Sequence, residues 1–160
     1  MHPNVVVVAN ALAAAGAQGS VRELAESVRT AVDAAAALGC PVGAIANSLI
    51  FMADGRPVLI LTSGAHRVDT GHVATLLGVQ KVKRATPEQV RAATGQPIGG
   101  VAPVGHPRPV RTMLDTELEQ YPVVWAAGGT PHTVFPTTYS ELLRVCSAES
   151  ITVEPPPAAG

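Results

Sequence analysis

The hydrophobic pattern predicts a hairpin of two long strands in the first half of the chain. Residues 43–52 (GAIANSLIFM) carry apolar side chains on both faces, which is typical of a strand inside a sheet. The Asp54-Gly55 turn signal follows, and residues 57–62 (PVLILT) form the returning strand. Five shorter strands are predicted at 20–27, 79–85, 112–114, 122–129 and 132–137, the first of them at a sheet edge.

Capping residues and glycine stops predict helices between these strands. Ser, Thr and Asp at a helix start accept hydrogen bonds from the first free N–H groups, and glycine ends a helix readily. The predicted helices are 5–15, 31–38 after Thr30, 70–77 after Asp69 or Thr70, 87–94 after Thr86, 116–120 after Asp115 or Thr116, and 138–145 with a Thr138/Glu141 capping box.

Six or seven strands with interspersed helices predict one α/β or α+β domain. We assign residues 1–150 to this domain and expect the Pro-rich segment 151–160 to be a frayed tail. Residues 95–109 contain four glycines and four prolines, too many for a helix or strand. This segment is therefore predicted to be an ordered functional loop.

The composition indicates a folded chain with an aliphatic core. Of the 160 residues, 47% are hydrophobic, 14% are charged and 3% are aromatic, which excludes intrinsic disorder. The apolar run after Met1 lacks a basic start and is shorter than the ~20 residues of a membrane span. Cys40 and Cys146 lie far apart, and the five histidines have no ligand spacing. We expect a cytoplasmic protein with reduced thiols, no signal peptide, no membrane contact, no metal and no cofactor.

The net charge limits the kind of nucleic-acid contact that the chain can make. A charge of −1 excludes the strongly basic balance that binds long stretches of DNA or RNA, whereas a local contact with an RNA end stays open. Only two of the eleven basic residues are lysines, Lys81 and Lys83. The candidate phosphate contacts are Arg29, Arg67, Arg84, Arg108 and Arg111.

Several segments occur in an order that is also found in one known family. They are RTAVDAAAALG (29–39), GAIANSLIF (43–51), DGRPVLILTSGAHRVD (54–69), RATPEQVRAATGQPIGGVAPVGH (84–106), MLD (113–115) and VWAAGGTPHTVF (124–135). The most specific part is TG…GGVAPVGH followed at a distance by AAGG. Over roughly residues 3–145, the chain resembles the YbaK/prolyl-tRNA synthetase-associated domain family of free-standing aminoacyl-tRNA editing proteins.

The resemblance implies both a fold and a reaction. The fold would be a curved mixed sheet of six or seven strands, or a partial barrel, with flanking helices. The reaction would be hydrolysis of the ester between a wrong amino acid and the 3′-terminal adenosine of a tRNA, without metal or covalent intermediate. A GxxxP loop, here Gly99-Gly100-Val101-Ala102-Pro103, would hold the substrate through its backbone. Glycines let N–H groups approach a ligand closely, and such donors stabilise a developing oxyanion.

One position departs from the family pattern. Asn47 occupies the position where the family usually has a lysine, and neither Lys81 nor Lys83 is placed to replace that lysine. An asparagine amide offers hydrogen bonds but no charge. The chain could hydrolyse its ester with backbone amides and the tRNA's own terminal hydroxyl, act on a different ester, or bind aminoacyl-tRNA without turnover.

Further site residues are predicted from the resemblance and from their residue types. His106 and His132 could contact substrate or orient water, or could be loop residues that serve neither role. Asp115 could position the substrate's amino group or cap the next helix, and Thr30 is a helix cap that could also line the pocket. His66 and His72 are interpreted as surface residues and Trp125 as core. The predicted catalytic residues are Asn47, Gly99, Gly100 and Val101; the predicted substrate-binding residues are Thr30, Ser48, Ala102, Pro103, Gly105, His106, Asp115, Gly128, Gly129 and His132.

Three functions from different classes follow. The first is a trans-editing deacylase for a tRNA that carries a small wrong amino acid, Ala, Ser, Thr or Cys. The second is a weakened or inactive module that binds aminoacyl-tRNA or a synthetase and has lost its lysine. The third is a small-molecule-binding domain without an RNA partner, which weak salt dependence of RNA binding, or no binding, would support. Monomer and homodimer both stay open.

Overall fold

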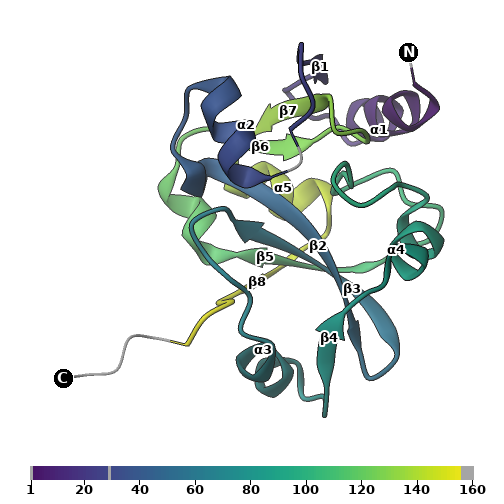
Figure 1. Cartoon of the computed structure of the whole chain (residues 1–160), viewed down its shortest axis with the longest axis vertical. Helices are drawn as coiled ribbons and strands as arrows, with labels where there is room; N and C mark the ends of the chain where they lie inside the picture. The colour runs from purple at the N-terminus through teal and green to yellow at the C-terminus, as the bar shows by residue number, and fades with distance from the viewer. Residues whose placement is uncertain (1, 29, 156–160) are drawn as a thin grey trace.

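The computed structural model describes residues 2–28 and 30–155, and these residues fold around one mixed eight-stranded sheet (Figure 1). The strands run in the order β1-β7-β6-β2-β3-β5-β8, and β4 pairs with β2 outside this path. Their bounds are β1 Arg22–Glu23, β2 Ile45–Ala53, β3 Arg56–Ser63, β4 Val82–Arg84, β5 Arg111–Asp115, β6 Val124–Ala127, β7 Thr133–Thr137 and β8 Glu149–Ile151.

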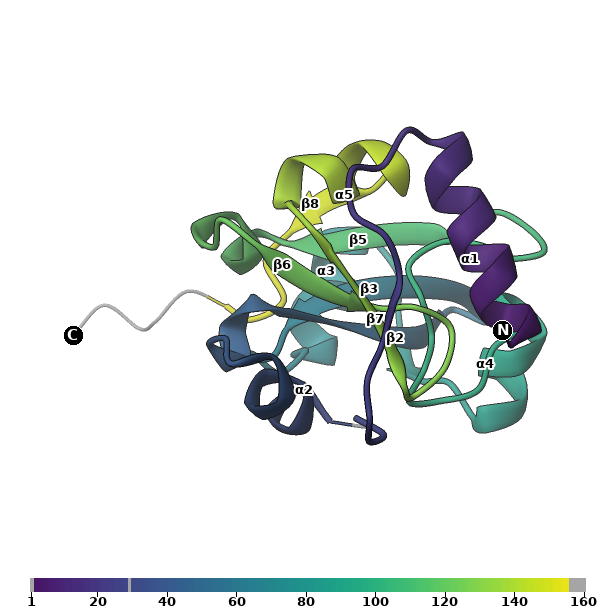
Figure 2. The same ribbon diagram turned by 90° about the horizontal axis from the view of Figure 1, so that it is seen from above.

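Helices cover both faces of the sheet (Figure 2). Val8 and Leu12 of α1 and Leu142 of α5 pack with the even-numbered β2 residues such as Ile50 in the largest core cluster. The other face is covered by α3, which packs on Phe51, and by α2, which packs on Ile45. The helices are α1 Pro3–Ala14, α2 Ala31–Leu38, α3 Thr70–Leu77, α4 Pro87–Thr94 and α5 Tyr139–Val145, with short 3₁₀ turns η1 Val42–Ala44 and η2 Thr116–Gln120.

The predicted mixed α+β fold is confirmed, including the long hairpin, which forms β2 and β3. The register pairs Ala46 with Ser63 and continues to Ala53 opposite Arg56, so Asp54 and Gly55 make the turn with positive φ. As predicted, β2 lies inside the sheet. Among the described residues, no helix is both long and apolar enough to cross a membrane.

The end of the chain differs from the prediction. The predicted frayed tail starts at residue 151, but Ile151 belongs to β8, which pairs with β5, and Val153 is buried. This strand raises the number from the predicted six or seven to eight, because three residues are too few to give a periodic signal. Residues 156–160 lie outside the described residues.

The start of α5 also differs from the prediction. Thr138 accepts from the N–H of Glu141 as expected, but the Glu141 carboxylate does not return the bond to Thr138. Instead, it accepts from the Gln18 N–H and the Thr137 hydroxyl. The reciprocal capping box occurs at α4, between Thr86 and Gln89.

Candidate active site

A gap in the sheet opens beside the middle of β2. On the edge of β2 away from β3, residues 45 and 46 pair with β6, and residues 51–53 pair with β4. Residues 47–50 of this edge pair with neither strand. The Gly64 N–H donates to the Ile45 carbonyl, so residues 47 and 49 exchange backbone hydrogen bonds with β3. Residues of even number therefore direct their backbone groups away from β3. As a result, the N–H and C=O of Ser48 face the gap.

A cleft of about 680 Å³ lies over this gap. Its floor is the central part of β2, and its walls come from α2, the β3–α3 connection, β4 with the start of α4, and the loop around Gly99, which surround β2 in Figure 1. Five of the predicted site residues line the cleft. They are Thr30, Asn47, Ser48, Gly99 and Val101.

The two polar side chains of the floor differ in their surroundings. Asn47 is exposed, and its side chain lies on the face of β2 that α2 and α3 cover. Ser48 points to the opposite face, and its Oγ is buried without a hydrogen-bond partner among the described residues. A buried hydroxyl without a partner is costly, so a ligand that bonds to it removes that cost.

The GxxxP loop is held by a buried side chain. Gln96, 2% exposed, accepts from the Ala102 N–H at 2.6 Å and donates to the Val104 carbonyl at 3.4 Å. The Gly100 N–H donates to the Pro97 carbonyl at 3.2 Å. The N–H groups of Gly99 and Val101 have no hydrogen-bond partner among the described residues. Both of these residues line the cleft, so their N–H groups are the candidate donors of the GxxxP loop.

Two glycines of this loop are required by its conformation and packing. Gly99 has φ +91°, which residues with a side chain rarely adopt. A Cβ at Gly100 would lie 2.6 Å from the carbonyl carbon of Thr130. Gly100 therefore lets the loop pack directly on the turn after β6, and Thr130 of that turn also lines the cleft.

The last residues of the loop segment brace it from behind. The His106 Nε2–H donates to the Ala102 carbonyl at 2.8 Å. Burial lowers the pKa of His106, and this bond opposes the shift only in part. Gly105, at φ +84°, packs against Val7 and Val8 of α1, and Pro103 is buried. Ala102, Pro103, Gly105 and His106 are not among the described residues that line the cleft.

The predicted glycine turn after β6 supports the cleft wall. Gly128 packs on Val21 and Thr133, and the Gly129 carbonyl accepts from the Asn4 side chain at 3.3 Å. His132 is exposed. Gly128, Gly129 and His132 are outside the described lining, whereas the hydroxyls of Thr130 and Thr133, 3.0 Å apart, belong to residues that line it.

Asp115 is a buried structural carboxylate. It is 1% exposed, and one oxygen accepts from the Glu117 N–H, which caps η2. The other oxygen accepts from the Ser63 N–H at 3.0 Å and contacts His66 Nδ1 at 2.9 Å. The helix-capping alternative for Asp115 is therefore confirmed. Of the described residues that bond to its carboxylate, His66 is the one that lines the cleft.

The amino-acid sequence around this cleft matches a known protein family. The model of the aminoacyl-tRNA editing domain matches residues 25–145. The chain belongs to this family. The predicted resemblance to YbaK and prolyl-tRNA synthetase-associated domains is thereby confirmed.

Relatives of this editing domain occur as parts of larger proteins and as small proteins. The chain is 40% identical over 90 residues to a proline–tRNA ligase of Nitratidesulfovibrio vulgaris, covering 56% of the chain and 16% of the ligase. It spans about one sixth of the length of such ligases. It is 30% identical to the uncharacterized Bacillus subtilis protein YwhH, covering 78% of the chain and 80% of YwhH. A crystal structure of a proposed trans-editing enzyme for prolyl tRNA synthetase matches with a TM-score of 0.90 and 43% identity, covering 97% of this chain and 99% of that one.

Several residues of the editing domain's cleft were not recognised in the sequence. His66, interpreted as a surface residue, lines the cleft and contacts Asp115. Trp125, interpreted as core, is only partly buried, lines the cleft and lies under Arg22, 5.2 Å from the guanidinium carbon to the ring centroid. Their positions in the chain are the signal that could have identified them, because His66 follows the predicted strand 57–62 and Trp125 lies in the predicted strand 122–129.

The structure also sorts the candidate phosphate contacts. Arg67 and Arg84 line the cleft. Arg111 pairs with Glu149 at 3.2 Å, and Arg108 is not among the described lining residues. Arg29 lies outside the described residues. Within the described residues, no three His, Cys, Asp or Glu side chains gather to hold a metal ion.

Proposed function

We propose that this editing domain is a trans-editing deacylase, which hydrolyses the ester of a tRNA mischarged with a small amino acid, Ala, Ser, Thr or Cys. The observation that carries the proposal is that Asn47 and Ser48 line one cleft with Gly99 and Val101, whose N–H groups have no partner among the described residues. The family match and the prolyl ligase relatives support tRNA as the substrate and a prolyl-tRNA synthetase as a candidate partner.

The chemistry required is modest because an aminoacyl ester is already activated. Binding must hold the ester beside a water, and donors must stabilise the oxyanion that forms when water attacks the carbonyl carbon. In the proposed complex, the N–H groups of Gly99 and Val101 donate to that oxygen. The free hydroxyl of the terminal ribose relays the proton: it accepts one from the attacking water and donates its own to the ester oxygen of the ribose. The bond between the carbonyl carbon and that oxygen then breaks, which releases the amino acid and leaves the tRNA with a free terminal hydroxyl.

Asn47 supplies hydrogen bonds to this site without charge. Its amide can donate to an ester or ribose oxygen, whereas a lysine at this position would add a positive charge near the oxyanion. Losing one good oxyanion donor typically costs a factor of about 10²–10³ in rate. We therefore propose an enzyme in which the backbone donors carry most of the transition-state stabilisation.

The deciding experiment is a deacylation assay with Ala-, Ser-, Thr- and Cys-charged tRNA. It compares the unmodified chain with Asn47→Lys and Gly100→Ala. We expect hydrolysis by the unmodified chain and a loss of about 100-fold or more in Gly100→Ala, because the new Cβ displaces the loop donors. Gly71→Ala in α3 is the matched control, since its Cβ would meet its nearest atom, Asp69 Oδ1, at the ordinary contact distance of 3.5 Å.

The same assay tests the second candidate function, which the exposed and uncharged Asn47 favours. Turnover by Asn47→Lys, with none by the unmodified chain, would identify a binding module that keeps the pocket without the chemistry. Absence of hydrolysis in both proteins, for all four amino acids, would overturn the deacylase proposal.

A further inference from the structure

The side chains that line the cleft are positive or uncharged. Arg67, Arg84 and His66 belong to the lining, and no Asp or Glu does among the described residues. The whole chain has a net charge of −1, so this local absence of carboxylates is not a property of the protein as a whole. A cleft lined in this way favours an anionic ligand.

Arg84 is the better placed of the two arginines. It pairs with Phe51 across β4 and β2, and its guanidinium carbon lies 5.6 Å from the centroid of that ring. Opposite residues of an antiparallel pair share a face, so Arg84 lies on the same face as Asn47. The Phe51 ring restrains the position of the guanidinium. Arg84 forms no salt bridge with a carboxylate among the described residues, so its positive charge is available to a ligand.

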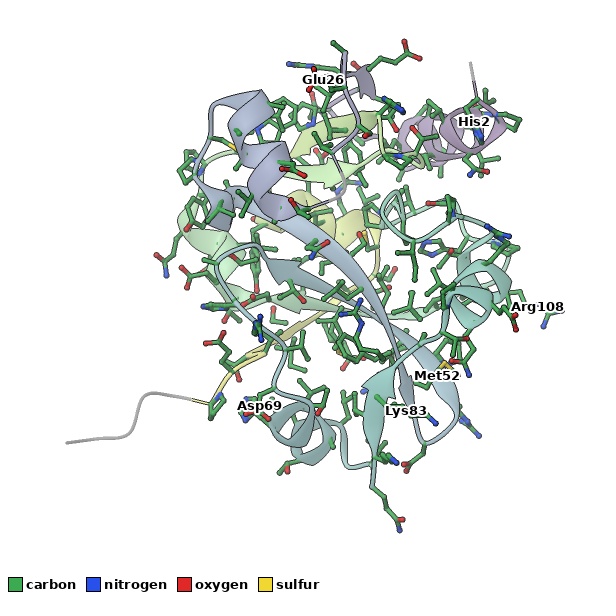
Figure 3. The ribbon with its side chains drawn as sticks, in the orientation of Figure 1. His2, Glu26, Met52, Asp69, Lys83 and Arg108 are labelled. Atoms are coloured by element: carbon green, nitrogen blue, oxygen red, sulfur yellow. The ribbon has the colours of Figure 1, made fainter. Side chains whose placement is uncertain are left out.

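Its neighbours are less suited to hold an anion in the cleft. The backbone N–H of Arg67 donates to the Glu154 carboxylate at 2.7 Å, which places a negative charge next to Arg67 although Glu154 itself is not among the described lining residues. Lys83, labelled on β4 in Figure 3, pairs with Met52 and therefore points to the opposite face of the sheet. Lys83 is not among the described residues that line the cleft.

We propose that Arg84 binds a phosphate of the 3′-terminal nucleotides of the RNA and thereby positions the ester over the Gly99–Val101 loop. The inference rests on the proposed function for the identity of its ligand. A planar guanidinium offers paired N–H donors that match phosphate oxygens, and such charge-assisted bonds are stronger than neutral ones. The positive charge for this contact comes from the Arg84 guanidinium on β4.

The test compares two small substrates that differ in phosphate. One is the CCA trinucleotide, with two phosphodiesters, and the other is adenosine alone; both are esterified with the amino acid selected by the tRNA assay, or with alanine if none is hydrolysed. We expect Arg84→Gln to raise KM for the trinucleotide about tenfold, as for the loss of one charged contact, and to leave KM for the adenosine ester within twofold. Arg84→Lys keeps the positive charge, so KM for the trinucleotide should rise less than in Arg84→Gln.

Lys83→Gln is the matched control, because it removes the same charge from the adjacent residue on the other face. It should change KM for neither substrate. Equal changes of KM for both substrates in Arg84→Gln, no change for either, or the same selective change in Lys83→Gln would overturn the phosphate contact. Thermal unfolding of each variant shows whether the domain remains folded under the assay conditions.

Failure of the deacylase proposal would look different. If the unmodified chain hydrolyses neither ester, calorimetry with a non-hydrolysable, amide-linked alanyl CCA analogue measures binding alone. Binding that weakens about tenfold in Arg84→Gln, and not in Lys83→Gln, would support the phosphate contact in a non-catalytic module. No binding by the unmodified chain would overturn both proposals.

Discussion

The side-chain carbonyl of Gln96 accepts a hydrogen bond from the N–H of Ala102 at 2.6 Å, across the turn that contains Gly99 and Gly100. The same amide donates to the Val104 carbonyl, so one buried side chain ties both sides of the loop. The Ala102 N–H is thereby occupied. Within the GxxxP loop, the N–H groups without a partner among the described residues are those of Gly99 and Val101. Gln96 thus sets which donors the loop can present.

Replacing Gln96 by leucine should loosen this loop. The change leaves the buried Ala102 N–H and Val104 carbonyl without partners, which should cost about 1–3 kcal/mol of unfolding free energy. Because the Gly99 and Val101 donors are then less well positioned, we expect kcat to fall at least about tenfold. Urea unfolding and the deacylation assay measure the two effects. Gln80→Leu, at an exposed position, should change neither by much; unchanged kcat in Gln96→Leu would contradict the loop's role.

Gly105 should tolerate alanine poorly. Its φ of +84° is strained for any residue with a side chain, and the new Cβ would lie 3.1 Å from Val7 of α1. We expect a loss of about 1–2 kcal/mol in unfolding free energy, measured by urea denaturation. The comparison is Gly71→Ala, where φ is not positive and the new Cβ would make an ordinary van der Waals contact at 3.5 Å, so the change should be neutral or slightly stabilising. Equal stability of the two variants would mean that α1 does not hold the loop from behind.

Asp115→Asn separates the two roles that the sequence left open. The buried carboxylate accepts from the Ser63 and Glu117 N–H groups, and an amide nitrogen in place of either oxygen would face a donor. We expect a loss of about 2–3 kcal/mol in unfolding free energy. KM, measured well below the melting temperature, should change by less than threefold, because the carboxylate is not in the cleft lining. A large rise in KM with little loss of stability would instead indicate that Asp115 binds the substrate's amino group.

Local signals in the sequence were sufficient for most elements of the fold. As predicted, α4 begins at Pro87 after the Thr86 cap and ends before Gly95. The Asp54-Gly55 turn joins the two strands of the long hairpin. These signals act between residues close in the chain. β8 depends on pairing with β5, more than thirty residues earlier in the chain, so no local pattern identified it.

The cleft was less predictable because it depends on how distant strands are placed. Ser48 faces a gap only because β6 and β4 stop short of it on the same edge of β2. His66 meets Asp115 because β3 and β5 are parallel neighbours whose ends lie together. The family resemblance identified the loop but not the different positions of its residues. Gly99 and Val101 line the cleft, whereas His106 bonds to the Ala102 carbonyl and is not among the described lining residues.

The stability of the protein should depend on pH through His106. Burial lowers the pKa of His106 in the folded state, so the folded protein takes up its proton at lower pH than the unfolded chain. The contribution of His106 to the unfolding free energy is therefore fully present above the pKa of the unfolded chain, about 6.5. It is lost as the pH falls below that value toward the lower pKa of the folded protein. Protonation of the unfolded chain drives the loss.

The His106→Gln variant isolates this effect, because a glutamine amide can still donate to the Ala102 carbonyl but does not titrate. We expect the melting temperature of the unmodified chain to fall more between pH 7.5 and pH 5 than that of His106→Gln, while the two agree in slope above pH 7. His132→Gln is the control for the substitution itself, because His132 is an exposed histidine. Parallel profiles for the unmodified chain and His106→Gln would show that acid destabilisation comes from other groups.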